Sequence, residues 1–527
     1  MKTIKAVVLI LFIMNFFVLT AQNEEQQKVI DKIIKEANEN SQLESLAHHL
    51  MDVIGPRLVG TPQMKASHDW VAGQYEDWGI DSKIEHWGDW KAWNRGITHI
   101  DMVEPRVQSL YGTQLAWSPS TSDKGVQGEV ITLPKVNNKG AFERWLPNVK
   151  GKIVLISQNQ ITGRPDYNWE EFATEESLKK MKSSKDSLAK LWRENIKNTG
   201  YGNRRNSSLN SEGIAKLEEA GALAIVSSYW SSGFGASKIF SASTKEVPTI
   251  NLQLEDYGML YRLAEYGNKP VIKIVAKSEN LGRTQTFNSL GTIKGEGDKA
   301  NEYVMLSAHL DSWDGGTGAT DNGTGTIIMM EAMRLLKKFY PNPKRTIIAG
   351  HWGSEEQGLN GSRAFVKDNP NVVQNLQALF NQDNGTGRVV RLSGGGFLHS
   401  YEFLTRWLNA APNDITKHIE TTFPGMPGGG GSDYASFLAA GAPGFSLSSL
   451  SWAYWNYTWH TNLDTYDKIV FDDVRNNAIL AAILVYMACE DPETFPKERR
   501  VMPISKRTGE AVKWPQVRSP NRSGGRD

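Results

Sequence analysis

Cysteine is nearly absent from this chain of 527 residues, because Cys489 is its single cysteine and no internal disulfide can form. Cys489 stands in the apolar segment LVYMACED, which predicts a buried structural thiol in a helix. An excess of one charge is also lacking, since 59 basic and 58 acidic side chains leave a net charge of +1. This balance argues against a nucleic-acid-binding protein and against a polybasic membrane protein.

Long apolar runs are lacking beyond the N-terminus, so no later segment is predicted to span a membrane. The N-terminus reads MKTIKAVVLILFIMNFFVLTAQNEEQQ, with two lysines, an apolar stretch over residues 6–19 and a small Ala21 before an acidic run. This order predicts a signal peptide over residues 1–21 that is cut near Ala21–Gln22. The alternative is an uncleaved anchor, for which the apolar run is short. An exported protein without disulfides fits a periplasmic or secreted bacterial enzyme.

Histidine is missing between His99 and His309, and the chain between them has a character of its own. VQGEVITL, GKIVLIS and GALAIVSS are short apolar runs typical of strands, and a charged helical segment over residues 166–197 separates the last two. This stretch contains no plausible cluster of metal ligands. Residues 125–280 are therefore predicted to form a separate β-rich, non-catalytic domain that is inserted into an enzyme.

The rest of the composition is typical of a globular protein with a sizeable core. The chain has 39% hydrophobic and 22% charged residues, and its length predicts two or three domains. Residues 22–124 begin with helical patterns and form the N-terminal part of the main domain. Over residues 281–500, strand patterns alternate with helix patterns, which predicts a three-layer α/β/α domain with a mixed, mostly parallel sheet. The composition of residues 501–527 predicts a disordered tail.

Five metal-type side chains occur in order along the C-terminal half of the chain. Two imidazoles and three carboxylates suit a pair of divalent cations. A further acid, Glu355, has no obvious ligand role and suits a general base for a metal-activated water. His309 and Asp311 are two residues apart on a strand and share a face, so Asp311 can hold the second ring nitrogen of His309. The five are His309 in SAHLDSW, Asp321 in ATDNGTG, Glu356 in WGSEEQGLNGS, Asp383 in FNQDNGTG and His460 in WHTNLDTYD.

Each of these residues also has an ordinary explanation when it is taken alone. Asp321 and Asp383 stand at Gly/Asn turns, which a carboxylate can cap. Glu355 and Glu356 can be a solvated pair, and His460 can be a packed histidine. Together, however, the ligands fall at strand ends of one α/β segment. Ligands in such folds gather beyond the carboxyl edge of the sheet, so the joint pattern favours a metal site.

The motifs that carry these residues resemble the two-zinc exopeptidase family of secreted aminopeptidases and carboxypeptidase Q. SAHLDSW, ATDNGTG, WGSEEQGLNGS, NQDNGTG, GSDYASF and WHTNLDTYDKI occur in the order of that family, and IGPRLVGTP resembles its N-terminal motif. The resemblance covers residues 42–500. The segment 125–280 resembles the protease-associated domain that this family often carries at the same position.

The resemblance implies a role for each of these positions and a cis peptide bond after Asp321. It also implies zinc as the metal, although cobalt or manganese suits the same ligands. In this family pattern Asp321 bridges two zinc ions. His309 and Asp383 bind one zinc, and Glu356 and His460 bind the other. Glu355 is the general base, and Asp311 is the orienting partner of His309.

Two features near these motifs have more than one interpretation. Tyr434 follows four glycines and the pair Ser432–Asp433, and is a candidate for oxyanion or substrate contact, with packing as the alternative. In WAYWNYTWH, aromatic side chains form either a specificity pocket for apolar substrate groups or a packed loop. The aromatic candidates are Trp455, Tyr457 and Trp459.

The sequence therefore predicts an exported zinc exopeptidase that removes single residues from short peptides or splits dipeptides. No motif decides between an aminopeptidase and a carboxypeptidase Q-like dipeptidase, and the oligomeric state is open, with a homodimer among the options. One alternative is a glutaminyl cyclase-like acyltransferase, which typically works with one zinc. Another is a non-catalytic binding protein that recruits partners through its protease-associated domain, for which eroded ligands are expected.

Overall fold

The computed structural model describes residues 24–203 and 207–524. The signal peptide predicted for residues 1–21 lies outside these residues. Among the residues described, no helix is both long enough and apolar enough to cross a bilayer. Cys489 is a free, buried thiol, as the sequence predicts.

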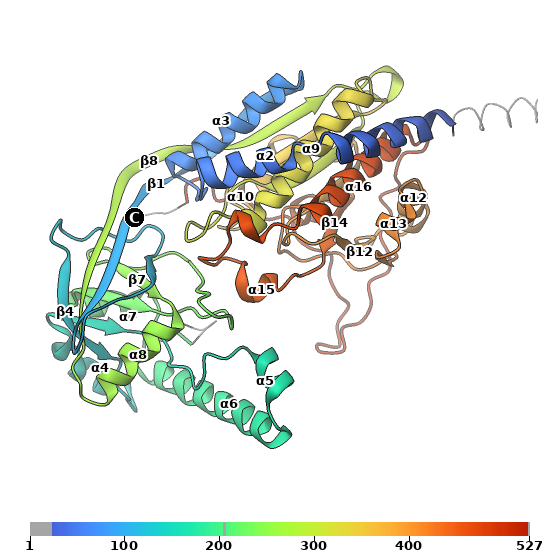
Figure 1. Cartoon of the computed structure of the whole chain (residues 1–527). Helices are drawn as coiled ribbons and strands as arrows, with labels where there is room; N and C mark the ends of the chain where they lie inside the picture. The colour runs from blue at the N-terminus through green and yellow to red at the C-terminus, as the bar shows by residue number, and fades with distance from the viewer. Residues whose placement is uncertain (1–23, 204–206, 525–527) are drawn as a thin grey trace, which may run out of the picture.

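One mixed sheet runs through the molecule, and its two halves join at β8 (Val271–Ile293), the long yellow-green strand in Figure 1. β1 (Asp81–Glu104) pairs antiparallel with β8 over almost its whole length, so the two strands form a ribbon between the halves. One end of β8 pairs with β10 (Thr346–Trp352), and the other end pairs with β4 (Val126–Thr132). We call the half that contains β10 the main lobe and the half that contains β4 the insert lobe.

Parallel strands form the centre of the main lobe. β9 (Tyr303–His309) lies between β10 and β11 (Leu376–Asn381), and β14 (Gly444–Ser449) lies beyond β11, all four running parallel. At the outer edge, β12 (Val389–Ser393) runs antiparallel to β14, and β13 (Glu420–Thr422) completes the sheet. Because the carboxyl ends of β9, β10 and β11 meet at one edge, the segments that leave these strands are brought together there.

Helices cover both faces of the main-lobe sheet. Leu306 of β9 packs with α9 (Thr324–Phe339) and α16 (Phe471–Glu490), whereas its neighbour Met305 packs on the opposite face with α10 (Asn360–Asp368). The predicted three-layer α/β/α architecture is thereby confirmed. The other helices of this lobe are α2 (Leu43–Ala47), α3 (Pro62–Asp77), α11 (Pro370–Gln374), α12 (Ser400–Leu408), α13 (Asn413–Thr416), α14 (Tyr434–Ala439) and α15 (Tyr454–Tyr457), with a π-helical turn at His48–Ile54 and a helix over residues 24–39.

Local sequence explains where two of these helices begin and end. α3 begins after Thr61, whose hydroxyl accepts the backbone N–H of Met64 at 3.2 Å, and Pro62 occupies the first helical position. α9 ends at Phe339 with Lys337 and Lys338 in its last turn, and cations are favourable beside the negative end of a helix dipole. α9 begins directly after the turn that contains Asp321.

The insert lobe repeats the parallel arrangement with shorter strands. β4, β5 (Lys152–Leu155), β6 (Ala224–Ser227) and β7 (Thr249–Leu252) are parallel neighbours, and β3 (Gly112–Gln114) pairs antiparallel with β7. Because β3 precedes residue 125, the lobe includes chain ahead of the predicted start of the insert. Helices cover both of its faces and form two apolar clusters with the strands. α8 (Leu254–Glu265) covers one face, and the other is covered by α4 (Lys139–Trp145), α6 (Glu175–Asn198) and α7 (Ser211–Glu219). Of the remaining elements, α5 (Asp166–Phe172) precedes α6, and β2 (Gln108–Ser109) pairs with β1.

The last described residues contact the main lobe, although the composition of residues 501–527 predicts disorder. The indole N–H of Trp514 donates to a backbone carbonyl of α14 at 2.9 Å, and its ring packs into the apolar cluster beside α16. Further on, the guanidinium of Arg522 pairs with the carboxylate of Asp368 at 2.7 Å. These two contacts hold the C-terminal segment across α14 and α10. Its composition does not predict this packing.

Candidate active site

The predicted ligand residues come together at the carboxyl edge of the main-lobe strands. In the parallel register, Trp352 at the end of β10 lies opposite His309 at the end of β9, so the turn after β10 starts beside the imidazole. We call this turn, residues 353–359, the glutamate turn. His309 ends β9, Glu355 and Glu356 lie in the glutamate turn, and Asp383 follows β11. Asp321 lies in the turn before α9, and His460 lies in the loop after α15.

The ligand atoms form two groups that share Asp321. Nε2 of His309 is 3.0 Å from Oδ1 of Asp383 and 3.5 Å from Oδ1 of Asp321. Nε2 of His460 is 2.9 Å from Oε2 of Glu356 and 3.3 Å from Oδ2 of Asp321. Within each group the candidate ligand atoms lie within 4.8 Å of one another. The two oxygens of Asp321 therefore face different imidazoles, which is the bridging position that the family resemblance implies.

These atoms are poorly satisfied by the protein itself. Oδ2 of Asp321, Oε1 of Glu356 and Nδ1 of His460 are buried and have no hydrogen-bond partner among the described residues. A buried polar atom that lacks a partner costs roughly 1–3 kcal/mol, so such atoms are rare unless they have another use. Carboxylate oxygens and imidazole nitrogens are ligands of divalent cations. The donor set therefore fits one divalent cation in each group.

Crowding and burial perturb the pKa values of the cluster. Burial raises the pKa of Glu356 to about 7, although His460 acts in the opposite direction. Burial also raises the pKa of Glu355 well above its usual value, again against the pull of His309. Burial alone would lower the pKa of His309, but Asp383 and other acids raise it well above its usual value. Like charges in a dry site hold protons in this way, and a bound cation would replace those protons.

Asp311 supports the site differently from the sequence prediction. Nδ1 of His309 is 2.9 Å from the backbone carbonyl oxygen of Asp311, whereas the Asp311 carboxylate lies 3.5 Å from that nitrogen. The carboxylate instead accepts the backbone N–H groups of Glu355 at 3.0 Å and Glu356 at 3.2 Å. The main chain therefore orients the imidazole, because the Asp311 side chain is used to fix the glutamate turn.

Arg57, in the IGPRLVGTP motif, is a buried side chain at the site that sequence reasoning did not identify. Its guanidinium donates to the backbone carbonyls of Leu310 at 2.7 Å, Thr317 at 2.8 Å and Gly318 at 2.9 Å. These carbonyls belong to the loop that joins the first candidate ligand to the shared one. The sequence shows the motif, but it does not show that Arg57 binds backbone carbonyls more than 250 positions further along the chain.

Asp464, in the WHTNLDTYD motif, was also missed. Its carboxylate accepts the backbone N–H of Thr320 at 2.8 Å and that of Asp321 at 3.0 Å. Burial raises the pKa of Asp464 to about 7. The peptide bond between Asp321 and Asn322 is cis, as the resemblance implies. Asp464 thus holds the main chain of the shared ligand.

Two residues of the site have left-handed backbone conformations that side chains seldom adopt. Ser354, directly before Glu355, has φ +63°, and His460 has φ +59°. Such conformations cost on the order of 1–3 kcal/mol and persist where the surroundings hold them, often at functional sites. Asn360 Nδ2 donates to Ser354 Oγ at 3.1 Å, and the N–H of Ile239 donates to the His460 carbonyl at 2.7 Å. Hydrogen bonds therefore support both conformations, one from the residue that follows the glutamate turn and one from the insert lobe.

Two tyrosines lie within electrostatic reach of the ligands. The ring of Tyr434, the candidate from the sequence, is half-buried, with its hydroxyl against Gly428, where no Cβ would fit. Burial, and then Asp383, raise the pKa of Tyr434. Tyr454 is buried, and burial followed by Asp321 raise its pKa well above the usual value. Tyr454 in turn acts to lower the pKa of the Asp321 carboxylate, so this residue of the WAYWNYTWH run lies close to the shared candidate ligand.

The three aromatic candidates have three different environments. Trp455 is 57% exposed, and the hydroxyl of Tyr457 lies 3.1 Å from that of Tyr167 in α5 of the insert lobe. The ring of Trp459 stacks on the imidazole of His460 with their centres 4.0 Å apart. Of the three, Trp459 is therefore the one in direct contact with a candidate ligand.

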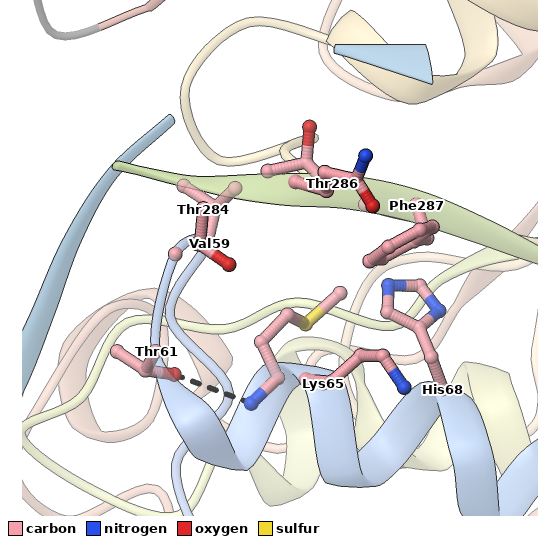
Figure 2. Close-up of a pocket in the computed structure, with 11 residues that line it drawn as sticks. Val59, Thr61, Lys65, His68, Thr284, Thr286 and Phe287 are labelled. Carbon is pink, nitrogen blue, oxygen red and sulfur yellow. Dashed lines mark hydrogen bonds between the residues drawn. The ribbon is translucent and has the colours of Figure 1, made fainter. Parts of the chain in front are cut away.

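A small pocket lies behind the glutamate turn, between α3 and β8 (Figure 2). It is lined by Lys65 and His68 from α3, by residues 284–287 from β8 and by Gly353. Nδ1 of His68 is 2.8 Å from the hydroxyl of Ser289, and burial lowers the pKa of His68 to about 3, so its ring is neutral. None of the candidate ligands lines this pocket, which is thus separate from the site.

The fold and the ligand cluster together are those of a metal-dependent hydrolase, with its site at the carboxyl edge of an α/β sheet. Residues 288–485 match the family model described as Peptidase family M28.

Over most of its length the chain is also similar to carboxypeptidase Q. It is 25% identical to the carboxypeptidase Q of Mus musculus over 463 residues, which are 85% of this chain and 86% of the mouse protein. The identity to that of Homo sapiens is also 25% over 463 residues, covering 85% of each chain.

Two solved structures show the same fold. One is a Peptidase M28 precursor from Shewanella amazonensis, with a TM-score of 0.63 and 23% identity, covering 91% of this chain and 99% of that one. The other is BSAP, a zinc aminopeptidase from Bacillus subtilis, with a TM-score of 0.53 and 19% identity, covering 86% of this chain and 97% of that one. Their likeness extends over both lobes, since each covers most of this chain.

Proposed function

We propose that this protein is an exported, two-zinc exopeptidase that hydrolyses short peptides or dipeptides. The observation that carries the proposal is the pair of ligand groups that share Asp321, with Glu355 next to Glu356 in the glutamate turn. The names of the relatives support it, because the chain is similar to carboxypeptidase Q and has the fold of a zinc aminopeptidase. Cobalt or manganese can take the place of zinc in the same ligands.

The proposed ligands divide between the two ions. When bound, zinc would acidify a water molecule and polarise the carbonyl of the scissile bond. The assignment is Asp321 to both ions, His309 and Asp383 to one, and Glu356 and His460 to the other.

Glu355 is the proposed proton carrier. It takes the proton from the attacking water and delivers it to the nitrogen of the leaving amine, so that one water is added across the broken C–N bond. Asp311 fixes the backbone of Glu355 and so aims its side chain. Tyr434 keeps its proton because burial raises its pKa, and we propose it as a hydrogen-bond donor to the oxyanion or the substrate.

The organisation of the chain is part of the same proposal. Residues 1–21 are a signal peptide that directs export, residues 22–124 and 281–500 form most of the peptidase domain, and residues 125–280 form the body of a protease-associated insert, to which β3 is added from the preceding chain. The two apolar clusters of the insert lobe support its description as a separate domain, since each is built from its own strands and helices. We propose a short peptide as the substrate.

Metal analysis of the purified protein, paired with a panel of dipeptides and aminoacyl amides, tests the proposal. We expect close to two zinc ions per chain and hydrolysis that depends on them. About one zinc per chain, together with cyclisation of N-terminal glutamine, would favour the glutaminyl cyclase-like acyltransferase. A fully metal-loaded protein that hydrolyses no peptide would favour the binding protein. The complete ligand set argues against that last alternative, since all five predicted ligands are present.

A further inference from the structure

A segment of the insert lobe, residues 237–240, lies directly against the loop that carries His460. The backbone N–H of Ile239 donates to the carbonyl of His460 at 2.7 Å, and that of Ser237 donates to the side chain of Asn462 at 2.8 Å. The ring of Phe240 meets the His460 imidazole edge-on, with centres 5.5 Å apart. The insert lobe therefore forms part of the wall of the candidate active site.

Lys238 is the charged residue of this segment. Its Nζ lies 3.9 Å from the centre of the Trp459 ring, and that ring stacks at 4.0 Å on His460, so the ammonium is within about 8 Å of the imidazole. Among the residues described, none of the ion pairs includes Lys238, and burial alone lowers its pKa, to about 8. Lys238 is thus a half-buried cation at the metal site without an acid to compensate its lost hydration.

We propose that Lys238 binds the free α-carboxylate of the substrate and so makes the enzyme prefer free dipeptides to amidated ones. The inference rests on the exopeptidase function proposed above. An extended dipeptide spans about 7 Å, and its carboxylate lies about one residue, or about 3.5 Å, beyond the scissile bond. A carbonyl at the metal ligands therefore places the carboxylate in the direction of an ammonium that lies across the Trp459 ring, within about 8 Å of His460. The Trp459 ring holds the ammonium in place before substrate binds.

Arg363 offers a competing position for the carboxylate. It lies in α10 and lines a surface pocket together with Arg518 and the glycine loop before α14. Burial and then the neighbouring Arg518 lower the pKa of Arg363, whereas Asp433 and Glu355 act in the opposite direction and partly compensate its charge. An arginine that faces two acids of the protein has less to gain from a substrate carboxylate than an ammonium that faces none. For this reason the observations favour Lys238, and the experiment includes both cations.

The test compares Ala-Ala with Ala-Ala amide as substrates of the zinc-loaded protein. For Lys238→Met we expect KM for Ala-Ala to rise about 10-fold or more, with kcat and the zinc content nearly unchanged and KM for the amide unaltered. Lys238→Arg should restore most of the loss because it restores the charge. Lys245→Met, which removes an exposed lysine of the same lobe, is the matched control and should change neither substrate.

Three outcomes would overturn the proposal. Equal losses on the two substrates, or a lower zinc content, would show that Lys238 only supports Trp459 and His460. A selective loss in Arg363→Met and none in Lys238→Met would assign the carboxylate to α10. Equal KM values for both substrates in the unmodified protein would show that no carboxylate subsite exists. Failure of the proposed function looks different, because the zinc-loaded protein would then hydrolyse neither substrate.

Discussion

The two lobes share one architecture but end their parallel strands in different chemistry. In the main lobe, β9, β10 and β11 lead into acids and imidazoles, several of whose buried atoms have no hydrogen-bond partner among the described residues. In the insert lobe, β5, β6 and β7 lead into Ser157, Ser227 and Asn251. These groups are neutral and have partners within the lobe, since Ser227 Oγ donates to Asn251 Oδ1 at 3.0 Å and Ser157 Oγ accepts the N–H of Ser228 at 2.9 Å. The buried atoms without a partner at this edge, Ser228 Oγ and Asn159 Oδ1, are also neutral.

The carboxyl edge of the insert-lobe strands therefore has a structural role, whereas that of the main-lobe strands is suited to bind a ligand. Polar groups that satisfy one another can be buried without a ligand, whereas crowded acids with unpartnered oxygens are stable only with protons or cations. The carboxyl edge of the insert-lobe strands, which we call the insert edge, also supports the candidate active site. Nδ2 of Asn251 donates to the backbone carbonyl of Lys238 at 3.0 Å, so this edge positions the segment that touches the His460 loop.

Removing the metal should have the largest effect, and should affect the main lobe far more than the insert lobe. Exhaustive chelation should reduce peptide hydrolysis to background, and added zinc should restore it. Because a ligand at 1,000 times its Kd stabilises the folded state by about 4 kcal/mol, chelation should also lower the melting temperature of the main lobe. Hydrogen exchange followed by mass spectrometry should show faster exchange in the turn before α9 and in the glutamate turn, and little change in β5–β7. Undiminished hydrolysis in protein shown to be metal-free would contradict the two-zinc proposal.

Glu355→Gln should have the next largest effect. It should lower kcat by about 10³-fold, because general base catalysis is typically worth 10²–10⁴-fold, and leave the zinc content unchanged. Glu356→Gln, one residue further, is the informative comparison, since this side chain faces His460 at 2.9 Å and should be needed to retain one ion. Near-normal turnover in Glu355→Gln, or loss of zinc from it, would remove its role as the proton carrier.

Asn251→Ala should weaken the insert edge without touching the metal site. The change removes the acceptor of Ser227 and a hydrogen bond to Ser237, so we expect a loss of roughly 1–3 kcal/mol in the free energy of unfolding. KM for free dipeptides should rise several-fold because Lys238 loses its support, while zinc content stays the same. Asn268→Ala, at an exposed position of the same lobe, is the control. An unchanged KM in a measurably destabilised variant would separate the insert edge from the site.

Much of the main lobe's site could be predicted because the candidate ligands lie in short motifs at strand ends. His309 to His460 could be selected as ligands since imidazoles and carboxylates followed apolar strands at one edge of the sheet. The strand–helix alternation likewise predicted the three layers, since it reflects burial on both faces of a parallel sheet.

The residues that position those ligands could not be predicted in the same way. Arg57 donates to backbone carbonyls, whereas Asp464 and Asp311 accept backbone N–H groups, and a backbone partner leaves no mark in the sequence. Asp311 was predicted only as the partner of His309. Lys238 was hidden for a related reason, because its partner Trp459 belongs to the other lobe and more than 200 positions separate them. Contacts between lobes depend on how β1 and β8 are aligned, and neither strand pattern specifies that alignment.

Trp455→Ala should have the smallest effect and is the sharpest test of the aromatic loop. The Trp455 side chain is 57% exposed, so the change should alter kcat/KM for dipeptides with apolar side chains by less than about 2-fold and leave stability within about 0.5 kcal/mol. Trp459→Ala, four residues further, removes the ring between Lys238 and His460 and should cost far more. If Trp455→Ala alone lowered the preference for apolar residues several-fold, the loop would be a specificity pocket of the kind the sequence suggested. If only Trp459→Ala matters, the loop's part in catalysis is confined to the ring that joins the two lobes.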